Sequence, residues 1–184
     1  MENIGRLELI IGPMYAGKSS ELLRIANRYR SIGKRVLAIN HVYNTRYGSN
    51  DQIITHDKRI LADNCIATET LSDIHKIPQY VDADIILIEE LQFFTNAYDF
   101  VVKAIDIDHK TVIAAGLDGD YRKQEFGDVL RLIPHADTVM KLTALCKSCG
   151  DGTPALFTKR IINSSDIKLV GGEESYQAVC RKHF

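Results

Sequence analysis

The fold follows from one stretch near the start of the sequence, Gly12-Pro13-Met14-Tyr15-Ala16-Gly17-Lys18-Ser19. It comes after the apolar run Leu7–Ile11 and before a helical pattern that begins at Ser20. A G-x4-G-K-S motif between a strand and a helix is the signature of a phosphate-binding loop. Its backbone N–H groups surround a phosphate, and the helix N-terminus adds partial positive charge. The motif predicts that residues 12–19 bind a nucleoside triphosphate, with Lys18 on the outer phosphates and Ser19 as a ligand of Mg²⁺.

Short apolar runs recur along the chain after this motif. They predict further strands at residues 36–39, 85–88, 111–115 and 139–142. Runs of this kind, without alternation between apolar and polar residues, are typical of strands buried on both faces of a parallel sheet. Helical spacing at residues 20–32 and 98–105 lies between such runs and completes a βαβ pattern. We therefore expect an α/β fold of the RecA-like P-loop type, with a parallel sheet and helices on both faces.

The sequence changes character after Leu142. Residues 143–184 contain paired cysteines, several glycines and little helical periodicity. We expect two units, a P-loop α/β nucleotide-binding domain at 1–142 and a small appended lobe at 143–184. The polar stretch Thr45–Asp57, which has a Gly-Ser-Asn run in its middle, is predicted to be a flexible loop.

Composition limits the class of protein. The chain has 184 residues, of which 45% are hydrophobic and 26% charged, and its formal net charge is −1. These values are ordinary for a globular protein, and they argue against nucleic acid or an anionic membrane surface as a partner. The sequence has neither a recognisable signal peptide nor an apolar run long enough to span a membrane. The protein is predicted to be cytoplasmic, where its four cysteines indicate metal binding or free thiols rather than disulfides.

Two acidic residues, Glu89 and Glu90, follow the strand predicted at 85–88. A P-loop enzyme places the carboxylate that holds Mg²⁺ at such a strand end. Neighbouring residues on an extended segment point to opposite sides, so one carboxylate can face the metal and the other a substrate hydroxyl. Taken alone, two such acids are more often solvated. The P-loop favours function, because sites in open α/β sheets lie at the carboxyl ends of strands. Glu89 is then predicted to bind Mg²⁺ and Glu90 to act as general base.

A C-x2-C … C-x2-H pattern is formed by Cys146, Cys149, Cys180 and His183. Each pair can hold a metal through a tight turn, which predicts a tetrahedral Cys3His zinc site. Its four ligands leave no open position, so the zinc would be structural rather than catalytic. The weakest member is His183, because a histidine near the end of a chain is usually just solvated. The fourth cysteine, Cys65, stands apart and is interpreted as a packed or idle thiol.

Eight further motifs stand in order along the chain: Asn44–Tyr47, Thr55–Asp57, Glu89–Phe94, Gly116–Tyr121, Phe126–Gly127, Val139–Ala144, Thr158–Arg160 and Val170–Gly172. Together with the phosphate-binding loop and the two metal-binding pairs, they resemble the type II thymidine kinases, the cellular cytosolic, bacterial and poxviral type. The resemblance runs nearly from end to end. A phosphate-binding loop alone would say little, but this ordered set of motifs is specific.

The resemblance implies an enzyme that transfers the γ-phosphate of ATP to the 5′-hydroxyl of thymidine, and also of deoxyuridine, in DNA-precursor salvage. It implies a lasso-like loop over the nucleoside, a homotetramer and feedback inhibition by dTTP. Glu90 would take the proton from the hydroxyl, and Lys18 and Arg46 would neutralise phosphate charge, with Arg160 as a weaker candidate. The nucleoside pocket would be lined by Gln92, Phe93, Tyr121, Phe126, Thr158, Ile167, Lys168, Leu169, Val170, Gly171 and Tyr176.

Three residues depart from the pattern of this family. Glu89 stands where the family usually has Asp, so the carboxylate expected to bind Mg²⁺ is one methylene longer. Leu91 replaces a small Gly and is expected to bring a bulky side chain beside the catalytic strand end. His183 replaces the usual fourth Cys, a substitution that zinc accepts readily.

Three other functions stay open from the sequence. The first is a kinase for another nucleoside, such as deoxyuridine or deoxycytidine. The second is an ATP-dependent nucleic-acid-binding module, which the near-zero net charge and the lack of a basic stripe disfavour. The third is a catalytically inactive structural zinc protein, which the intact Lys18, Ser19 and Glu90 disfavour.

Overall fold

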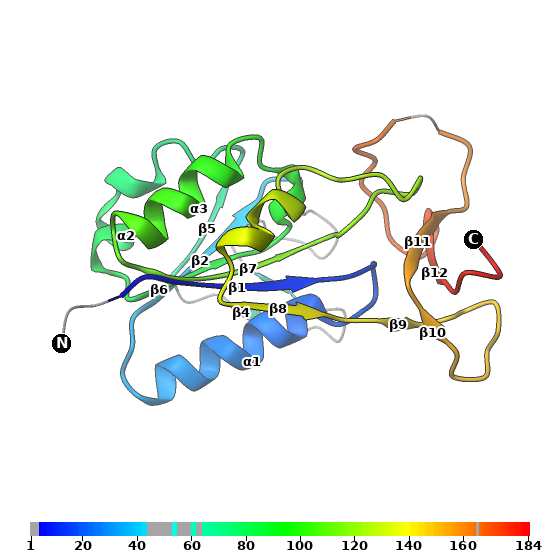
Figure 1. Ribbon diagram of the computed structural model, residues 1–184, viewed down its shortest axis with the longest axis horizontal. Coiled ribbons are helices and arrows are strands. Elements are labelled where there is room, and N and C mark those ends of the chain that lie inside the picture. Colours follow the sequence, from blue (N-terminus) through cyan, green and yellow to red (C-terminus); the bar gives the residue numbers. More distant parts are fainter. Residues whose placement is uncertain (1–3, 44–52, 55–59, 62–63, 165) are drawn as a thin grey trace.

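A six-stranded sheet forms the centre of the computed structural model, which describes residues 4–43, 53–54, 60–61, 64–164 and 166–184 (Figure 1). Its strand order is β5-β2-β6-β7-β1-β8, and every pair is parallel. The strands are β1 (Arg6–Ile11), β2 (Val36–His41), β5 (Cys65–Thr68), β6 (Ile85–Ile88), β7 (Thr111–Gly116) and β8 (Thr138–Lys141). The predicted parallel sheet is confirmed. The edge strand β5, which contains the half-buried Cys65, has no counterpart in the prediction.

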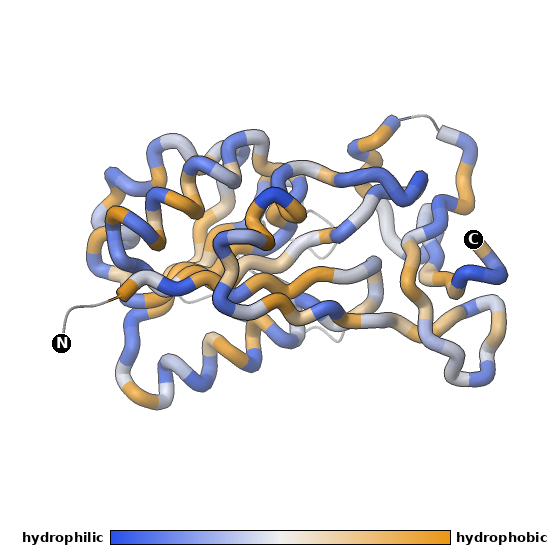
Figure 2. Tube along the Cα trace, in the orientation of Figure 1, coloured by the Kyte–Doolittle hydropathy of each residue, from blue (hydrophilic) through white to orange (hydrophobic). Residues whose placement is uncertain are grey.

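Helices cover both faces of the sheet, as expected. Helix α1 (Lys18–Ser31) packs on one face, and α2 (Pro78–Asp82) and α3 (Ala97–Asp106) lie on the other (Figure 1). Figure 2 shows hydrophobic residues along the central strands and alternating hydrophobic and hydrophilic residues along α1. The strands serve two cores, because Leu7 and Leu9 belong to the cluster under α3 whereas Ile10 belongs to the one under α1. This double burial explains why the strand sequences do not alternate.

Short 3₁₀ segments complete the side of the sheet that carries α3. They are η1 (Ile74–Lys76), η2 (Leu91–Phe93) and η3 (Leu130–His135). A two-residue antiparallel pair joins β3 (Ile53–Ile54) to β4 (Ile60–Leu61). The rest of the loop predicted at 45–57 lies outside the described residues. Within the described part of the chain, no helix is both long and apolar enough to cross a membrane.

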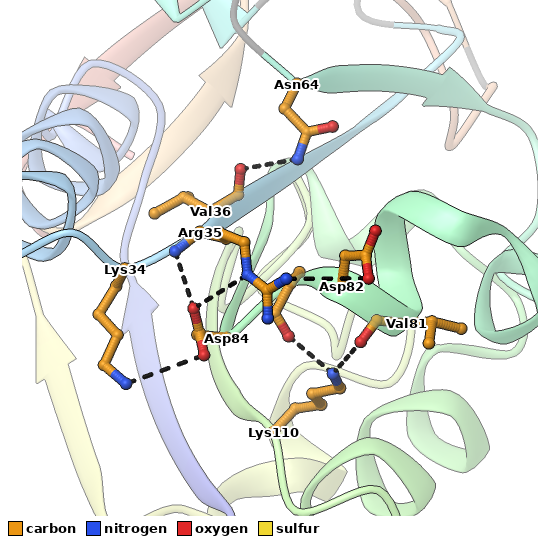
Figure 3. A network of polar contacts seen from close by, with 9 residues as sticks. Lys34, Arg35, Val36, Asn64, Val81, Asp82, Asp84 and Lys110 are labelled. Carbon is orange, nitrogen blue, oxygen red and sulfur yellow. Dashed lines mark hydrogen bonds and ion pairs between the residues drawn. The ribbon is translucent and has the colours of Figure 1, made fainter.

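A polar network ties the amino ends of β2 and β6 together (Figure 3). Asp84 accepts a hydrogen bond from the backbone N–H of Arg35 at 2.9 Å, and this bond lowers the pKa of its carboxyl group. Lys110 donates to the carbonyl oxygens of Val81 and Ala83 at 2.9 and 2.7 Å. The network also contains ion pairs of Asp84 with Lys34 and Arg35, and exposed pairs of this kind contribute only about 0–1 kcal/mol each.

The C-terminal part of the chain lies beyond the carboxyl ends of the strands (Figure 1). It consists of two antiparallel pairs, β9 (Ala144–Leu145) with β10 (Pro154–Ala155) and β11 (Phe157–Arg160) with β12 (Tyr176–Val179). No helix is assigned among the described residues of 143–184, which agrees with the lack of helical periodicity there. The carboxyl ends of β1, β6 and β7 all face these strands, so the segments that follow them meet the C-terminal part at one edge of the sheet.

Candidate active site

The loop between β1 and α1 has the backbone geometry of a phosphate-binding loop. Gly12 and Gly17 have φ angles of 145° and 84°, which L-residues with side chains rarely adopt. A Cβ at Gly12 would lie 2.3 Å from the carbonyl oxygen of Leu142, so this glycine lets the loop pass close to the end of β8. Lys18 is 9% exposed and its Nζ donates to the carbonyl oxygen of Pro13 at 2.8 Å. The ammonium group is therefore directed back into the loop.

Ser19 and Glu89 meet at the carboxyl ends of β1 and β6. The hydroxyl of Ser19 donates to Oε1 of Glu89 at 2.7 Å, and the carboxylate is only 3% exposed. A hydroxyl beside a carboxylate is an oxygen donor set of the kind that Mg²⁺ binds. The residues present therefore fit this ion. The extra methylene of Glu89, relative to an Asp at this position, does not keep its carboxylate away from the loop.

The backbone turns sharply at Glu90, which separates the two carboxylates. Its φ and ψ of 55° and 42° lie in the left-handed region, an uncommon conformation for a residue with a side chain. Gln92 donates from Nε2 to Oε2 of Glu90, and its Oε1 accepts from the N–H of Leu117 at 3.0 Å. Gln92 therefore links the Glu90 carboxylate to the end of β7. Whereas Glu89 contacts Ser19, Glu90 faces a cavity.

This cavity collects most of the residues predicted for the nucleoside pocket. It is lined by Glu90, Gln92, Phe93, Tyr121, Phe126, Thr158, Ile167, Leu169, Val170, Gly171 and Tyr176. Lys168, predicted with them, instead reaches the carbonyl oxygen of Phe93 at 3.5 Å and is absent from the lining. Five lining residues were not predicted for this role, namely Met14, Tyr43, Leu117, Gly119 and Asp120. Leu117, Gly119 and Asp120 could have been found, because they stand within the motif that supplied Tyr121.

Arg160 organises one wall of the cavity. Its guanidinium lies 3.7 Å from the ring centroid of Tyr121 and donates to the hydroxyl of Tyr176 at 2.8 Å. It also donates to the carbonyl oxygens of Ser164 and Ile167 at 3.0 and 3.4 Å. These contacts hold two aromatic rings and the start of segment 164–171 together. The described contacts of Arg160 are thus with the wall and this segment, and phosphate binding by Arg160 stays a prediction.

The phosphate-binding loop is bound directly to the C-terminal strands. The N–H of Met14 donates to Oγ1 of Thr158 at 2.9 Å, and the hydroxyl of Tyr15 donates to the carbonyl oxygen of Tyr176 at 3.4 Å. Thr158 lies on β11 and Tyr176 on β12, and both also line the cavity. The phosphate loop and the cavity therefore share the same two strands.

Four side chains that could hold a metal ion cluster at the far end of these strands. The donor atoms of Cys146, Cys149, Cys180 and His183 lie within 4.8 Å of one another. The sulfurs of Cys149 and Cys180 are 3.8 Å apart, which equals the separation of about 3.8 Å that two thiolates have on a tetrahedral zinc with Zn–S bonds of about 2.3 Å. Nδ1 of His183 lies 3.3–3.7 Å from the three sulfurs. The donor set fits zinc, and Nδ1 is the imidazole nitrogen that faces it.

The family model described as "Thymidine kinase" matches residues 5–184 of this chain. The chain belongs to the thymidine kinase family. It is 42% identical over 184 residues to a thymidine kinase of Oryza sativa subsp. japonica, covering 98% of this chain and 66% of the rice protein. It is 38% identical over 178 residues to the thymidine kinase of Myxoma virus (strain Uriarra), covering 97% of this chain and 95% of the viral protein. Among solved structures, the flagellar accessory protein FlaH from Methanocaldococcus jannaschii matches with a TM-score of 0.48 and 14% identity, covering 88% of this chain and 74% of that chain.

Leu91, the bulkiest departure from type II thymidine kinases, does not enter the cavity. Its side chain is fully buried and belongs to the core cluster under α3. It begins the 3₁₀ turn η2, which directs it inward immediately after the left-handed Glu90. The core therefore accommodates the leucine, and the cavity next to Glu90 stays open.

His41 is a buried residue that the sequence analysis did not single out. It ends β2, is 2% exposed, and packs its ring 5.5 Å from Phe93 and 4.7 Å from Phe94. Burial lowers the pKa of its imidazole, and the nearby Lys168 ammonium lowers it further. A neutral His41 therefore supports Phe93, one of the cavity walls. No sequence motif marks this position.

Gly127 fixes the backbone beneath Gln92, which gives a prediction. Its φ is 61°, and a Cβ there would lie 2.4 Å from the carbonyl oxygen of Gln92. Gly127→Ala is expected to displace Gln92 and with it Glu90, and so to lower kcat, in addition to the cost of about 1–2 kcal/mol for a left-handed alanine. Gly33→Ala is the control, because Gly33 has a φ of 77° and open space around it, at the end of α1. Urea unfolding and kcat measure the two effects, and equal kcat values in both variants would contradict the prediction.

Proposed function

We propose that this chain transfers the γ-phosphate of ATP to the 5′-hydroxyl of thymidine. The observation that carries the proposal is the divergence of two consecutive carboxylates. Glu89 binds the P-loop serine at 2.7 Å, and Glu90 faces a cavity lined by Phe93, Tyr121 and Phe126. A triphosphate on the loop and a nucleoside in the cavity would then meet beside Glu90. This is the arrangement that in-line transfer between two bound substrates needs.

The roles of the residues follow from their positions. The loop amides and Lys18 would bind and neutralise the phosphates. Ser19 and Glu89 would hold Mg²⁺, which when bound shields charge on the transferring phosphoryl group. Glu90, oriented by Gln92, would accept the proton of the 5′-hydroxyl. Arg46 lies outside the described residues, and its contribution to phosphate neutralisation stays a prediction.

The cavity suits a nucleoside with a flat base. Its walls are aromatic, which suits a flat base, and backbone groups of segment 167–171 can meet the polar edge of that base. A wrong base would leave buried polar groups unpaired, which costs much of the binding energy. We therefore include deoxyuridine, which lacks only the 5-methyl group of thymidine, as a further substrate. The proposal has four further parts. It includes feedback inhibition by dTTP, assembly into a homotetramer, a cytoplasmic location and a separate lobe formed by residues 143–184.

The test is a comparison of all deoxynucleosides with Mg-ATP, measured as the 5′-monophosphate formed. We expect fast product from thymidine, slower product from deoxyuridine and little from the others. Lys18→Ala is the control and should abolish product, because it removes the charge that neutralises the outer phosphates. Fast product from deoxycytidine in place of thymidine would transfer the assignment to another nucleoside kinase. Salt-sensitive retention on DNA without any product would favour the nucleic-acid-binding module.

A further inference from the structure

A tight turn at residues 120–124 lies between the cavity and the metal-binding end of the molecule. Asp120 is 8% exposed, and its Oδ1 accepts hydrogen bonds from the N–H groups of Arg122 and Gln124 at 2.7 and 2.9 Å. The N–H of Lys123 donates to the carbonyl oxygen of Asp120 at 3.0 Å, and the N–H of Asp120 to that of Gln124 at 2.9 Å. These bonds close the turn on itself, so the side chains that it carries are displaced together.

One side of this turn faces the nucleoside cavity. Tyr121 lines the cavity, and two cations contact its ring, with Arg160 3.7 Å and Arg122 4.9 Å from its centroid. The hydroxyl of Tyr121 also accepts from Nε of Arg122 at 2.8 Å. The position of the Tyr121 ring is thus set by the turn and by β11, which carries Arg160.

The other side of the turn faces Phe157, on β11, and Phe184, which lies after the end of β12. Nζ of Lys123 lies 3.8 Å from the ring centroid of Phe184 and 4.7 Å from that of Phe157. The two rings contact each other edge to face, with centroids 5.4 Å apart. Both distances from Nζ are within the range of about 6 Å in which a cation is attracted to an aromatic face. Lys123 has a φ of 63°, so the turn holds it in a conformation that a lysine rarely adopts.

Both phenylalanines are joined to functional groups by a single peptide bond. Phe184 follows His183, whose Nδ1 faces the three cysteine sulfurs, and Phe157 precedes Thr158, which binds the phosphate loop and lines the cavity. A second cation, Arg181, lies 5.1 Å from the Phe157 centroid, and Nζ of Lys159 donates to the carbonyl oxygen of His183 at 3.0 Å. The two rings therefore depend on the metal-binding end for their placement.

We propose that Lys123, packed on Phe157 and Phe184, is a positioning residue that couples the Cys3His cluster to the Tyr121 wall of the nucleoside cavity. The inference rests on the proposed function, since it concerns how that cavity is held for thymidine. An ordered cluster would fix the two rings, the rings would fix Lys123, and the closed turn would fix Tyr121. The alternative is that Lys123 is simply a solvated side chain with no effect on the cavity, as most exposed lysines are.

The variant Lys123→Met removes the charge and keeps the length of the side chain. We expect a rise of about two- to five-fold in KM for thymidine, the size expected from one partly exposed cation–π contact, with KM for ATP unchanged. Lys123→Arg should restore the KM for thymidine, because a guanidinium also binds aromatic faces. Lys110→Met is the matched control. Lys110 belongs to the network at the amino ends of the strands (Figure 3). It also lies 5.5 Å from the Tyr80 ring, and its replacement should leave both KM values unchanged.

A second readout does not depend on turnover. The protein is loaded with zinc, and zinc release to a chromophoric chelator is measured at equilibrium, as the chelator concentration that removes half of the metal, with and without thymidine. In the wild type, thymidine should raise this concentration, because coupling between two binding equilibria is reciprocal. In Lys123→Met this effect should be reduced about two- to five-fold in the same proportion as the KM change, and Lys123→Arg should retain it.

Three results would overturn the coupling. The first is a Lys123→Met variant with wild-type KM for thymidine and an unchanged effect of thymidine on zinc release. The second is an equal rise in KM for both substrates, which indicates general loosening of the site. The third is a Lys110→Met variant with the same thymidine phenotype. Failure of the proposed function is a different result, in which the wild-type protein forms no product from thymidine.

Discussion

Glu90→Gln is expected to lower kcat for thymidine by about 10²-fold or more, because the variant removes the group that accepts the hydroxyl proton. The loss should be smaller than in Lys18→Ala, since the proton leaves late in a loose transition state and charge neutralisation dominates. Binding of ATP should be retained, because Glu89 is the carboxylate that accepts a hydrogen bond from Ser19 of the phosphate loop. Single-turnover kinetics and a fluorescent ATP analogue measure the two quantities separately.

Asp106→Asn is the control for this variant. Asp106 is an exposed acid at the end of α3, so its neutral isostere should leave kcat unchanged. If Glu90→Gln keeps near-normal turnover, Glu90 is not the proton acceptor. The Gln92–Glu90 hydrogen bond would then serve only to shape the turn after β6.

Loss of the metal is expected to have the second large effect. Structural zinc contributes on the order of 10 kcal/mol to the folding of small metal-binding units. The cluster adjoins β11 and β12, which supply Thr158 and Tyr176 to the cavity. Cys149→Ser should therefore abolish zinc binding and thymidine phosphorylation together. The six-stranded sheet has its own two cores. In Cys149→Ser it should therefore unfold at a higher temperature than the C-terminal strands, in a separate transition.

Cys65→Ser is the matched control for the metal site. Cys65 is the first residue of the edge strand β5, at the amino end of that strand. The cluster lies beyond the carboxyl ends of β1 and β8 (Figure 1). This variant should keep one zinc per chain and full activity. Zinc content by atomic absorption and calorimetric unfolding provide the measurements. A Cys149→Ser protein with full zinc and a single wild-type transition would contradict the assignment of the cluster.

Much of the fold could be predicted because local patterns and burial agree. Continuous apolar runs at 85–88 and 111–115 become the buried strands β6 and β7, since a strand between two helical layers has no exposed face. The predicted helix at 20–32 becomes α1, and Gly33 follows it with a φ of 77°. The strand β5 was missed because Cys65–Thr68 is short, only half-buried and without a strong strand pattern. Its pairing with β2 comes from tertiary structure.

Site residues could be predicted where a local motif determines their position. They could not be predicted where the site depends on contacts between distant segments. Lys18, Ser19, Glu89 and Glu90 could be placed because the loop and the strand end fix them. The place of the Leu91 side chain could not be predicted. A family pattern gives the size of the residue, but the left-handed backbone at Glu90 decides that the side chain points into the core. The roles of Tyr43 and Lys123 depend on contacts with segments far away in the sequence, which no local pattern encodes.

The hydrogen bond between Met14 and Thr158 joins residues 144 positions apart, and this has a consequence for the protein during its synthesis. When residues 1–142 have emerged from the ribosome, every strand of the six-stranded sheet has been synthesised. The emerging chain then still lacks Thr158 and Tyr176, so its phosphate loop has no partner strand and its cavity has no closing wall. Thymidine binding should therefore arise only after residues 158–176 have been made, and a nascent chain cannot be protected by its own substrate before then.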